Sequence, residues 1–379
     1  MAEAFYQNFK LGILGGGQLG RMLVQSGIDL NINFSILDPD PTAPCKSIAE
    51  FTTGKLTDYE TVMAFGQSCD LITIEIENVN TKALRELERL GKKVFPQPDV
   101  IELIQDKRTQ KEFYKTHNIP TAEFILTQNK EEVIKHKSFL PAVNKLGKEG
   151  YDGRGVQILR TEKDLDKAFD APGLLEKLID FEKEISVIVA RNESGEICSY
   201  PAVEMVFHPI RNLVEYLFSP AQISDAIVKQ ADKIARKVAD KIQIVGLLAV
   251  EMFVTKQGEV LVNEIAPRPH NSGHQTIEAN VTSQYEQHLR AILNLPFGNT
   301  SIILPSAMVN LLGEDGYAGQ ARYQGLEKVL AVEGVHVHLY GKKMTKPFRK
   351  MGHVTIVDAD VESLKKKANF VKEHLKVIA

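Results

Sequence analysis

The sequence has few cysteines and no long hydrophobic run. Its three cysteines, Cys45, Cys69 and Cys198, lie far apart and form no C-x-x-C pair. This spacing argues against a disulfide framework or a zinc cluster and indicates a reducing compartment. No apolar run approaches the roughly 18 residues of a membrane span, and the N-terminus "MAEAFYQNFK" lacks a basic region followed by an apolar core. We therefore expect a soluble, cytoplasmic protein.

The chain also lacks an excess of positive charge. Its formal net charge is -3, with 43% hydrophobic and 25% charged residues. This balance argues against a nucleic-acid binder that depends on global positive charge. We find no internal repeat or low-complexity tract, and 379 residues predict roughly two or three globular domains.

The first part of the chain alternates strand-like and helix-like segments from Lys10 to about Phe95, which is typical of a doubly wound parallel sheet. Gly15, Gly17 and Gly20 have G-x-G-x-x-G spacing after the first strand, and Asp38 ends the second. This pattern formally completes a dinucleotide-binding fingerprint. Glycines at such a turn also relieve backbone crowding whatever ligand lies above them, so the pattern alone leaves the ligand open.

The pattern changes near Pro98, where we place a domain border. Short strands joined by glycine-containing turns then predict an α+β region with antiparallel sheets. One amphipathic helix interrupts them, capped by Ser224 and with apolar residues at helical spacing from Ile227 to Ile242. "LNLPFGNT" is interpreted as a linker, and the last 80 or so residues as a small β-rich module that ends in a lysine-rich helix.

Two glutamates lie on strands that flank Gln257-Gly258. If those two residues form the whole turn, the register places Glu251 directly opposite Glu264 on one face. Sheets normally avoid opposed carboxylates, and a divalent cation such as Mg²⁺ would remove the repulsion. A different turn length would put one glutamate in solvent, and the pattern alone does not decide between the two.

The next segment, "NEIAPRPHNSGH", supplies a group of hydrogen-bond donors. Two prolines fix the chain, while Arg268, His270, Asn271 and His274 lie within seven residues. A planar guanidinium beside an imidazole suits a small planar oxyanion. Because the segment follows a candidate metal ligand, we interpret it as part of an active site.

Two further segments are less specific. "NKLGKEGYDGRG", residues 144–155, can close glycine amides over phosphates, with Lys145 as a point charge. It is not a Walker sequence, and taken alone a glycine-rich hairpin is the simpler interpretation. "LLEKLIDFEKE", with Glu176 and Glu184, could be any strand exit.

Together, in this order and spacing, these segments resemble ATP-grasp enzymes, and more closely the N5-carboxyaminoimidazole ribonucleotide synthetase family of purine biosynthesis. "GGGQLGRM", "GYDGRG" and "NEIAPRPHNSGH" carry the resemblance, which extends from about residue 10 to "RKMGH" at 349–353. It implies an α/β and α+β fold with a Rossmann-like pre-ATP-grasp domain, a two-part ATP-grasp domain and a small C-terminal β-rich domain. The expected boundaries are 1–97, 98–298 and 299–379.

The resemblance implies an ATP site, with Mg²⁺ bound by Glu251 and Glu264. Adenine would be read mainly by backbone groups and the ribose by Glu184. The implied ATP-binding residues are Lys107, Lys145, Gly150, Tyr151, Asp152, Gly153, Arg154, Gly155, Val156, Glu176, Lys177, Leu178, Ile179, Glu184, His208, Asn263 and Glu264. Where the family has "QDR", this chain has Gln105-Asp106-Lys107-Arg108, so whether Lys107 or Arg108 replaces the family arginine is open.

The resemblance also implies bicarbonate and aminoimidazole ribonucleotide as substrates. The implied catalytic residues, which would hold bicarbonate and then carboxyphosphate, are Arg154, Arg268, His270 and Asn271. The implied ribonucleotide site consists of Gln18, Leu19, Glu75, Asp152, Lys342, Arg349 and Lys350. A homodimer and delivery of the product to a downstream mutase are expected, and no nucleic-acid or membrane partner.

Three other functions compete with this one. A formate-using ATP-grasp glycinamide ribonucleotide transformylase would share the ATP residues, although "RPHNSGH" favours bicarbonate. A nicotinamide-dependent oxidoreductase would use the opening glycines but leaves residues 144–274 unexplained. A non-catalytic binding module would require opposed glutamates with no metal.

Overall fold

The N-terminal part of the chain forms a five-stranded parallel sheet. The computed structural model describes residues 5–148, 155–207 and 214–379. The strand order is β3-β2-β1-β4-β5, with parallel pairing throughout, which confirms the predicted doubly wound arrangement. Its elements are β1 (Lys10–Leu14), α1 (Gln18–Ile28), β2 (Asn33–Asp38), β3 (Glu50–Thr53), α2 (Tyr59–Gln67), β4 (Leu71–Ile74), α3 (Thr81–Arg89) and β5 (Lys93–Val94).

Two helices lead from this sheet to a small antiparallel one. The first begins at Pro98, where we place the domain border. The small sheet has the order β6-β9-β7-β8. Thr121, in the segment that leads into β6, forms an isolated β-bridge with Val262 of the large sheet. The elements are α4 (Pro98–Ile104), α5 (Lys107–Thr116), β6 (Phe124–Thr127), α6 (Lys130–Lys135), η1 (Lys137–Phe139), β7 (Ala142–Leu146), β8 (Val156–Leu159), η2 (Glu162–Lys167) and β9 (Gly173–Lys177).

The largest sheet is antiparallel and has nine strands. Its order is β15-β14-β10-β12-β13-β16-β21-β19, with β11 paired to β10. Its first part comprises β10 (Phe181–Arg191), β11 (Ile197–Ser199), β12 (Val203–Phe207), β13 (Val214–Ser219), α7 (Asp225–Ile242), β14 (Gly246–Thr255), β15 (Val260–Ala266), η3 (Asn271–Gly273), α8 (Thr276–Ala279) and α9 (Gln284–Ile292).

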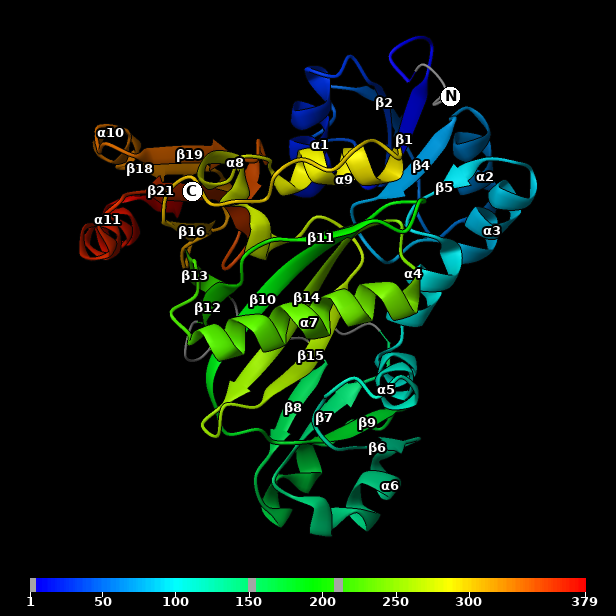
Figure 1. Ribbon diagram of the computed structural model, residues 1–379, viewed down its shortest axis with the longest axis vertical. Helices are drawn as coiled ribbons and strands as arrows, with labels where there is room; N and C mark the ends of the chain where they lie inside the picture. The colour runs from blue at the N-terminus through cyan, green and yellow to red at the C-terminus, as the bar shows by residue number, and fades with distance from the viewer. Residues whose placement is uncertain (1–4, 149–154, 208–213) are drawn as a thin grey trace.

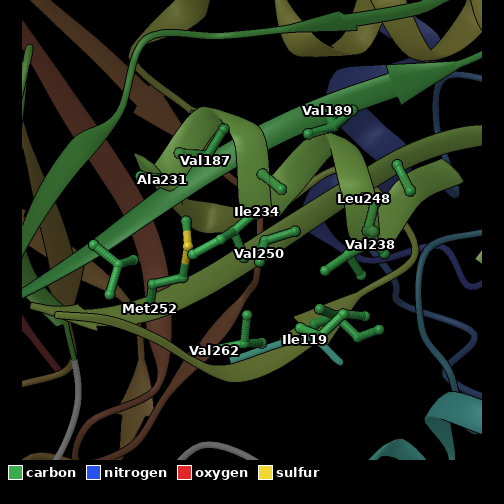
Figure 2. Packing of buried hydrophobic residues seen from close by; sticks show 14 of the residues in the cluster. Ile119, Val187, Val189, Ala231, Ile234, Val238, Leu248, Val250, Met252 and Val262 are labelled. Carbon is green, nitrogen blue, oxygen red and sulfur yellow. The ribbon is translucent and has the colours of Figure 1, made fainter. Parts of the chain in front are cut away.

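Helix α7 covers one face of this sheet (Figure 1). Its N-cap is Ser224, whose side chain accepts a hydrogen bond from the Ile227 amide, as predicted. Ala231, Ile234 and Val238 of α7 face alternate residues of β10 and β14 (Figure 2). Each buried isoleucine, valine, leucine or methionine of this cluster contributes roughly 1.5–3 kcal/mol. Within the described part of the chain, no helix is both long and apolar enough to cross a membrane.

The last part of the chain continues the same sheet. Strand β16 pairs with β13, so the sheet runs across the predicted border at residues 298–299. A separate apolar cluster lies under α11, and the three-domain division stays a prediction. The elements are β16 (Ser306–Leu312), β17 (Gly319–Gln320), β18 (Arg322–Gln324), α10 (Leu326–Leu330), β19 (Val335–Leu339), β20 (Met344–Thr345), β21 (Lys350–Val357), α11 (Val361–His374) and β22 (Lys376–Ile378).

His288 on α9 joins the N-terminal sheet to the large sheet. Its Nδ1 accepts a hydrogen bond from the Leu247 amide at 3.3 Å, which leaves Nε2–H to donate to the Thr73 hydroxyl at 2.9 Å. The side chain is fully buried, and burial lowers its pKa to about 3. The imidazole is therefore neutral in the folded protein.

This buried imidazole predicts acid-sensitive stability. Below about pH 6.5 the unfolded chain binds a proton that folded His288 does not, so stability falls by about 1.4 kcal/mol per pH unit through this residue. We expect His288→Asn to lower the melting temperature at pH 7.5 but to show a smaller fall between pH 7.5 and 5.5 than the wild type. The exposed His336→Asn is the control and keeps the wild-type fall. An unchanged fall in His288→Asn would contradict the assignment.

Candidate active site

Side-chain alternation gives the large sheet a core face and a polar face. Ile185 and Val187 of β10 pack in the core cluster with α7, so Glu184 lies on the opposite face. On β14, Glu251 lies between two residues of the same core cluster. Glu251 pairs with Glu264 of β15. Three carboxylates from three adjacent strands therefore share the polar face.

Glu251 lies opposite Glu264 as predicted, although the turn is not the predicted one. The Thr255 amide donates to the Glu259 carbonyl, so the turn contains residues 256–258 and not two residues. The extra residue shifts the register by one, and a bulge between Met252 and Glu251 shifts it back. Asn263 is the unpaired residue of that bulge. The bulge is what brings the two carboxylates together.

Lysines from α5 and β7 converge beside this pair. Lys145 Nζ lies 2.5 Å from Glu176 Oε2 and donates to Asn263 Oδ1 at 2.9 Å. Lys111 pairs with the other Glu176 oxygen, and its side chain is 3% exposed. Burial lowers the pKa of Lys111 to about 8, although Glu176 opposes the shift. Together with Lys107, these lysines line a small cavity whose charge suits an anionic ligand.

The structure also places the two residues that replace the family arginine. Lys107 Nζ lies 2.5 Å from Glu264 Oε2. Arg108 instead binds Asp106, the N-cap residue of α5, at 2.6 Å. Lys107 is therefore the one that contacts the carboxylate pair.

The carboxyl groups differ in their proton affinity. Burial raises the pKa of Glu251 well above its usual value, and the charges of Glu264 and Glu184 add to this rise. The Lys107 ammonium lowers the pKa of Glu264. Burial raises the pKa of Glu184 to about 8, Glu264 reinforces the rise and Lys145 opposes it. A cation bound beside these groups would favour their charged forms and so oppose the rise in the pKa of Glu251 and Glu184.

His270 lies next to the carboxylate pair and is held from several sides. Its Nε2 is 3.5 Å from Glu251 Oε1. Its Nδ1 is 2.9 Å from the Ser272 hydroxyl, which lies 2.8 Å from the Ser186 hydroxyl on β10. Gln284 accepts from the His270 amide and donates to its carbonyl. These contacts fix the imidazole before any ligand arrives.

Arg268 and Asn271 lie on the same loop. Arg268 Nε is 2.9 Å from Glu77 Oε1, in the N-terminal part of the chain. Asn271 Oδ1 and Nδ2 are buried and have no hydrogen-bond partner within residues 5–148, 155–207 and 214–379. Buried amides seldom stay unpaired, so Asn271 is a candidate for ligand contact. His274, predicted as a further donor, is fully buried and its Nδ1 is 2.9 Å from the Tyr285 hydroxyl, which makes it part of the packing.

The opening glycine loop binds carboxylates of its own chain. The Gly16 amide donates to Asp38 at 2.7 Å, and the Gly17 and Gly20 amides donate to Glu75 at 2.7 and 2.5 Å. A Cβ on Gly17 would lie 2.3 Å from Glu75 Oε1, so this glycine makes room for the carboxylate. A dinucleotide would place its pyrophosphate at this helix terminus, where the carboxyl groups of Asp38 and Glu75 already occupy the amides.

Part of the predicted ribonucleotide site meets near this loop. Lys342 donates to Gln18 Oε1 at 2.7 Å and to the Lys350 carbonyl at 2.7 Å. Arg349 donates to the Met344 carbonyl at 2.8 Å. Leu19 is half-buried and packs against the N-terminal core. Gln18, Lys342 and Lys350 are therefore close together.

The predicted adenine segment is partly engaged within the protein. The Lys177 amide donates to the Glu123 carbonyl at 2.8 Å and the Leu178 amide to the Pro141 carbonyl at 3.1 Å. The Lys177 ammonium donates to the Phe139 carbonyl, away from the cavity lysines. These two amides are thus engaged within the protein, and the contact of the segment with adenine through its other backbone groups stays a prediction.

Of the residues predicted for the glycine-rich ATP loop, the structure describes Gly155 and Val156. Gly155 and Val156 lie at the start of β8, where the Gly155 carbonyl accepts from the Leu146 amide at 2.9 Å. The predicted residues outside the described part of the chain are Gly150, Tyr151, Asp152, Gly153, Arg154 and His208.

Sequence reasoning missed Lys111, Glu77 and Ser186. Lys111 follows Lys107 by four residues and so shares its helix face, a signal that could have identified it. Glu77 follows Glu75 by two residues in an alternating segment. Ser186 carries no sequence signal, because its partner Ser272 is 86 residues away.

Comparisons with known families agree with this arrangement. Residues 9–105 match the ribonucleotide synthetase preATP-grasp domain, residues 112–285 the ATP-grasp domain, and residues 306–367 the phosphoribosylaminoimidazole carboxylase C-terminal domain. The fold and the site define an ATP-grasp enzyme.

Individual relatives narrow the family. The phosphoribosylaminoimidazole carboxylase of Candida glabrata is 39% identical over 95% of this chain, which spans 65% of that protein's length. The crystal structure of N5-carboxyaminoimidazole ribonucleotide synthetase from Thermotoga maritima is 45% identical, with a TM-score of 0.90 and coverage of 98% of this chain and 99% of that one. The N5-carboxyaminoimidazole synthase of Aspergillus clavatus, in complex with ADP and 5-aminoimidazole ribonucleotide, is 34% identical, with a TM-score of 0.88 and coverage of 97% and 98%. The chain belongs to the N5-carboxyaminoimidazole ribonucleotide synthetase family.

The carboxylate pair predicts opposite effects for two similar substitutions. In metal-free buffer at pH 8, Glu251→Gln should raise the free energy of unfolding by about 1 kcal/mol, because it removes a buried carboxyl group that resists ionisation. The gain should shrink as the pH falls below about 4.3, the pKa of a glutamate in an unfolded chain, because the carboxyl group is then protonated in both states. Glu264→Gln should lower stability by about 1 kcal/mol, because Lys107 loses its partner in a half-open cleft.

Urea unfolding with chelator present measures both effects. The exposed Glu112→Gln of α5 is the control and should lie within about 0.5 kcal/mol of the wild type. Equal destabilisation by Glu251→Gln and Glu264→Gln would contradict the opposed-charge interpretation.

Proposed function

We propose that this chain carboxylates 5-aminoimidazole ribonucleotide to N5-carboxyaminoimidazole ribonucleotide, using ATP and bicarbonate, in purine biosynthesis. The observation that carries the proposal is the position of His270, on the loop that also carries Arg268 and Asn271, 3.5 Å from Glu251 of the opposed pair Glu251 and Glu264. Donors for a small oxyanion thus lie beside oxygen ligands for a cation. The complex of the Aspergillus clavatus relative with ADP and 5-aminoimidazole ribonucleotide supports these substrates.

ATP would lie between the small sheet and the polar face of the large one. Its phosphates would contact Lys107 and Lys145, whose ammonium groups line the cavity. Adenine would be read by the Ile179 amide and by carbonyl groups, because the two preceding amides are engaged. Glu184, on the same face, would contact the ribose hydroxyls.

Glu251 and Glu264 would hold Mg²⁺. Carboxylate oxygens are the donors that this hard cation prefers. Burial and the charges of Glu264 and Glu184 raise the pKa of Glu251, and a bound cation would favour the charged form of this carboxyl group. The ion would neutralise charge on the transferred phosphoryl group.

The chemistry follows from the poor electrophilicity of bicarbonate. A bicarbonate oxygen attacks the γ-phosphorus of ATP, ADP leaves, and carboxyphosphate forms. Lys145 offsets the charge on the phosphoryl oxygens, while Arg268 and His270 hold the carboxylate end. The 5-amino group then attacks the carboxyl carbon, or CO₂ released from it within the site. The carbamate and phosphate are the products.

The ribonucleotide would lie between the glycine loop and the C-terminal basic side chains. Glu75 and Gln18 would contact its polar groups, and Lys342, Arg349 and Lys350 its phosphate. The hydrogen bond from Lys342 to Gln18 supports this placement, because it joins the two halves of the predicted site.

The proposal also covers the cellular location and the oligomeric state of the protein. Three free cysteines, two of them buried, are typical of a reducing compartment and support a cytoplasmic location. We also propose that the protein is a homodimer and that it delivers the unstable carbamate to a downstream mutase. Both proposals follow from the family resemblance.

Substrate-stimulated phosphate release tests the function against its rivals. With ATP, Mg²⁺ and bicarbonate present, aminoimidazole ribonucleotide should stimulate release at least about 10-fold, and glycinamide ribonucleotide with formate should not. Stimulation by formate would favour the transformylase. If no substrate stimulates phosphate release but NADH fluorescence increases on mixing, the oxidoreductase would be favoured. If neither effect is seen, a binding module would be favoured.

Arg268→Ala tests the oxyanion site. We expect ATP affinity within about 2-fold of the wild type, because the ATP lysines are untouched. Coupled turnover should fall at least about 100-fold, the size typical for loss of a charged donor in a transition state. Arg322→Ala, at an exposed position of β18, is the control and should keep wild-type turnover. Normal turnover of Arg268→Ala would refute the assignment.

A further inference from the structure

The segment that follows β4 contacts three parts of the predicted site. Glu75 accepts hydrogen bonds from two amides of the glycine loop. Glu77, two residues later, contacts Arg268. Gln105, two residues before Lys107, donates to the carbonyls of Glu77 and Val79. Residues 75–79 therefore link the ribonucleotide side of the site to the oxyanion loop and to the start of α5.

The ion pair between Glu77 and Arg268 is shielded from solvent. Glu77 Oε1 lies 2.9 Å from Arg268 Nε, and the two side chains are 23% and 19% exposed. Arg268 Nη1 also donates to the Pro269 carbonyl at 3.1 Å. The ion pair with Glu77 on the Nε side and the hydrogen bond from Nη1 to Pro269 together restrict rotation of the guanidinium, because the five donors of the planar group are fixed relative to one another. Glu77 is therefore one of the groups that set the direction of the Arg268 donors.

Glu77 is itself held at its backbone. Gln105 Nε2 donates to the Glu77 carbonyl at 2.7 Å and to the Val79 carbonyl at 3.0 Å. The Val79 amide donates to the same Glu77 carbonyl at 2.8 Å. Because its carbonyl accepts one hydrogen bond from Val79 in its own loop and one from Gln105 at the end of α4, the Glu77 backbone is fixed in place.

We propose that Glu77 is a positioning residue that orients the Arg268 guanidinium toward bicarbonate, and that Gln105 fixes Glu77 for this role. The inference rests on the proposed function. Glu77 does not touch the reacting atoms and acts through Arg268. The same segment carries Glu75, so the ribonucleotide and the oxyanion are aligned against one short stretch of backbone.

A competing role for Glu77 makes an opposite prediction. If its carboxylate competed with bicarbonate for Arg268, neutralising it would tighten bicarbonate binding. If it orients Arg268, neutralising it loosens bicarbonate binding, since a misdirected donor can cost up to about 100-fold in rate.

Glu77→Gln separates the two roles. We expect the apparent KM for bicarbonate to rise about 10-fold and more ADP to be released per carbamate formed, with ATP affinity within about 2-fold of the wild type. Glu102→Gln is the matched control, because it neutralises another ion-paired glutamate on nearby α4, and should leave all three values unchanged. Gln105→Ala should reproduce the change in smaller measure, and Glu77→Asp should restore part of the wild-type KM.

A double-mutant cycle shows whether the effect passes through Arg268. In an Arg268→Ala background, Glu77→Gln should cause no further loss of bicarbonate-dependent ADP release. An unchanged or lowered bicarbonate KM in Glu77→Gln, or a full additional loss in the double variant, would overturn the inference. Melting temperatures identify any variant that fails to fold, and Gln105→Ala then carries the test. Failure of the wild type to carboxylate aminoimidazole ribonucleotide would instead refute the proposed function.

Discussion

The repulsion between Glu251 and Glu264 is the constraint on which the site depends. Two carboxylates opposite each other on one sheet face are unfavourable in an isolated hairpin. Here Lys107 approaches Glu264 from another element, and His270 approaches Glu251. The N-terminus of α5 and the loop after β15 are therefore drawn toward the same strands. Local destabilisation of this kind is typical of functional sites, where a ligand supplies the missing charge.

The same strands carry both the core and the chemistry. One face of β10 and β14 packs against α7 (Figure 2). The other face holds Glu184 and Glu251. Because neighbouring residues on a strand face opposite ways, the position of each acidic group is set by the packing of the apolar residues beside it. A well-packed core thus fixes where the acidic side chains of these strands lie.

Local sequence patterns predicted the main secondary-structure elements of this protein. They could not predict contacts between residues far apart in the sequence. Alternation and capping predicted the parallel sheet and the helix that begins after Ser224, because both depend on neighbouring residues. The opposition of Glu251 and Glu264 was predicted from a turn that is one residue too short, and the bulge at Asn263 compensates. Glycine spacing could not identify its ligand, because Glu75 lies 58 residues from Gly17. Roles of individual residues stay predictions.

The pairing of β13 with β16 has a mechanical consequence. Since the large sheet is continuous into the C-terminal part, that part cannot swing away without breaking a ladder of backbone hydrogen bonds. The small sheet, in contrast, is a separate sheet. The segment that leads into it pairs with the large sheet at an isolated β-bridge of Thr121. Hinge motion costs least where few backbone bonds must break. Nucleotide exchange should therefore proceed by tilting of the small sheet relative to the large sheet, while the rest of the molecule keeps its arrangement.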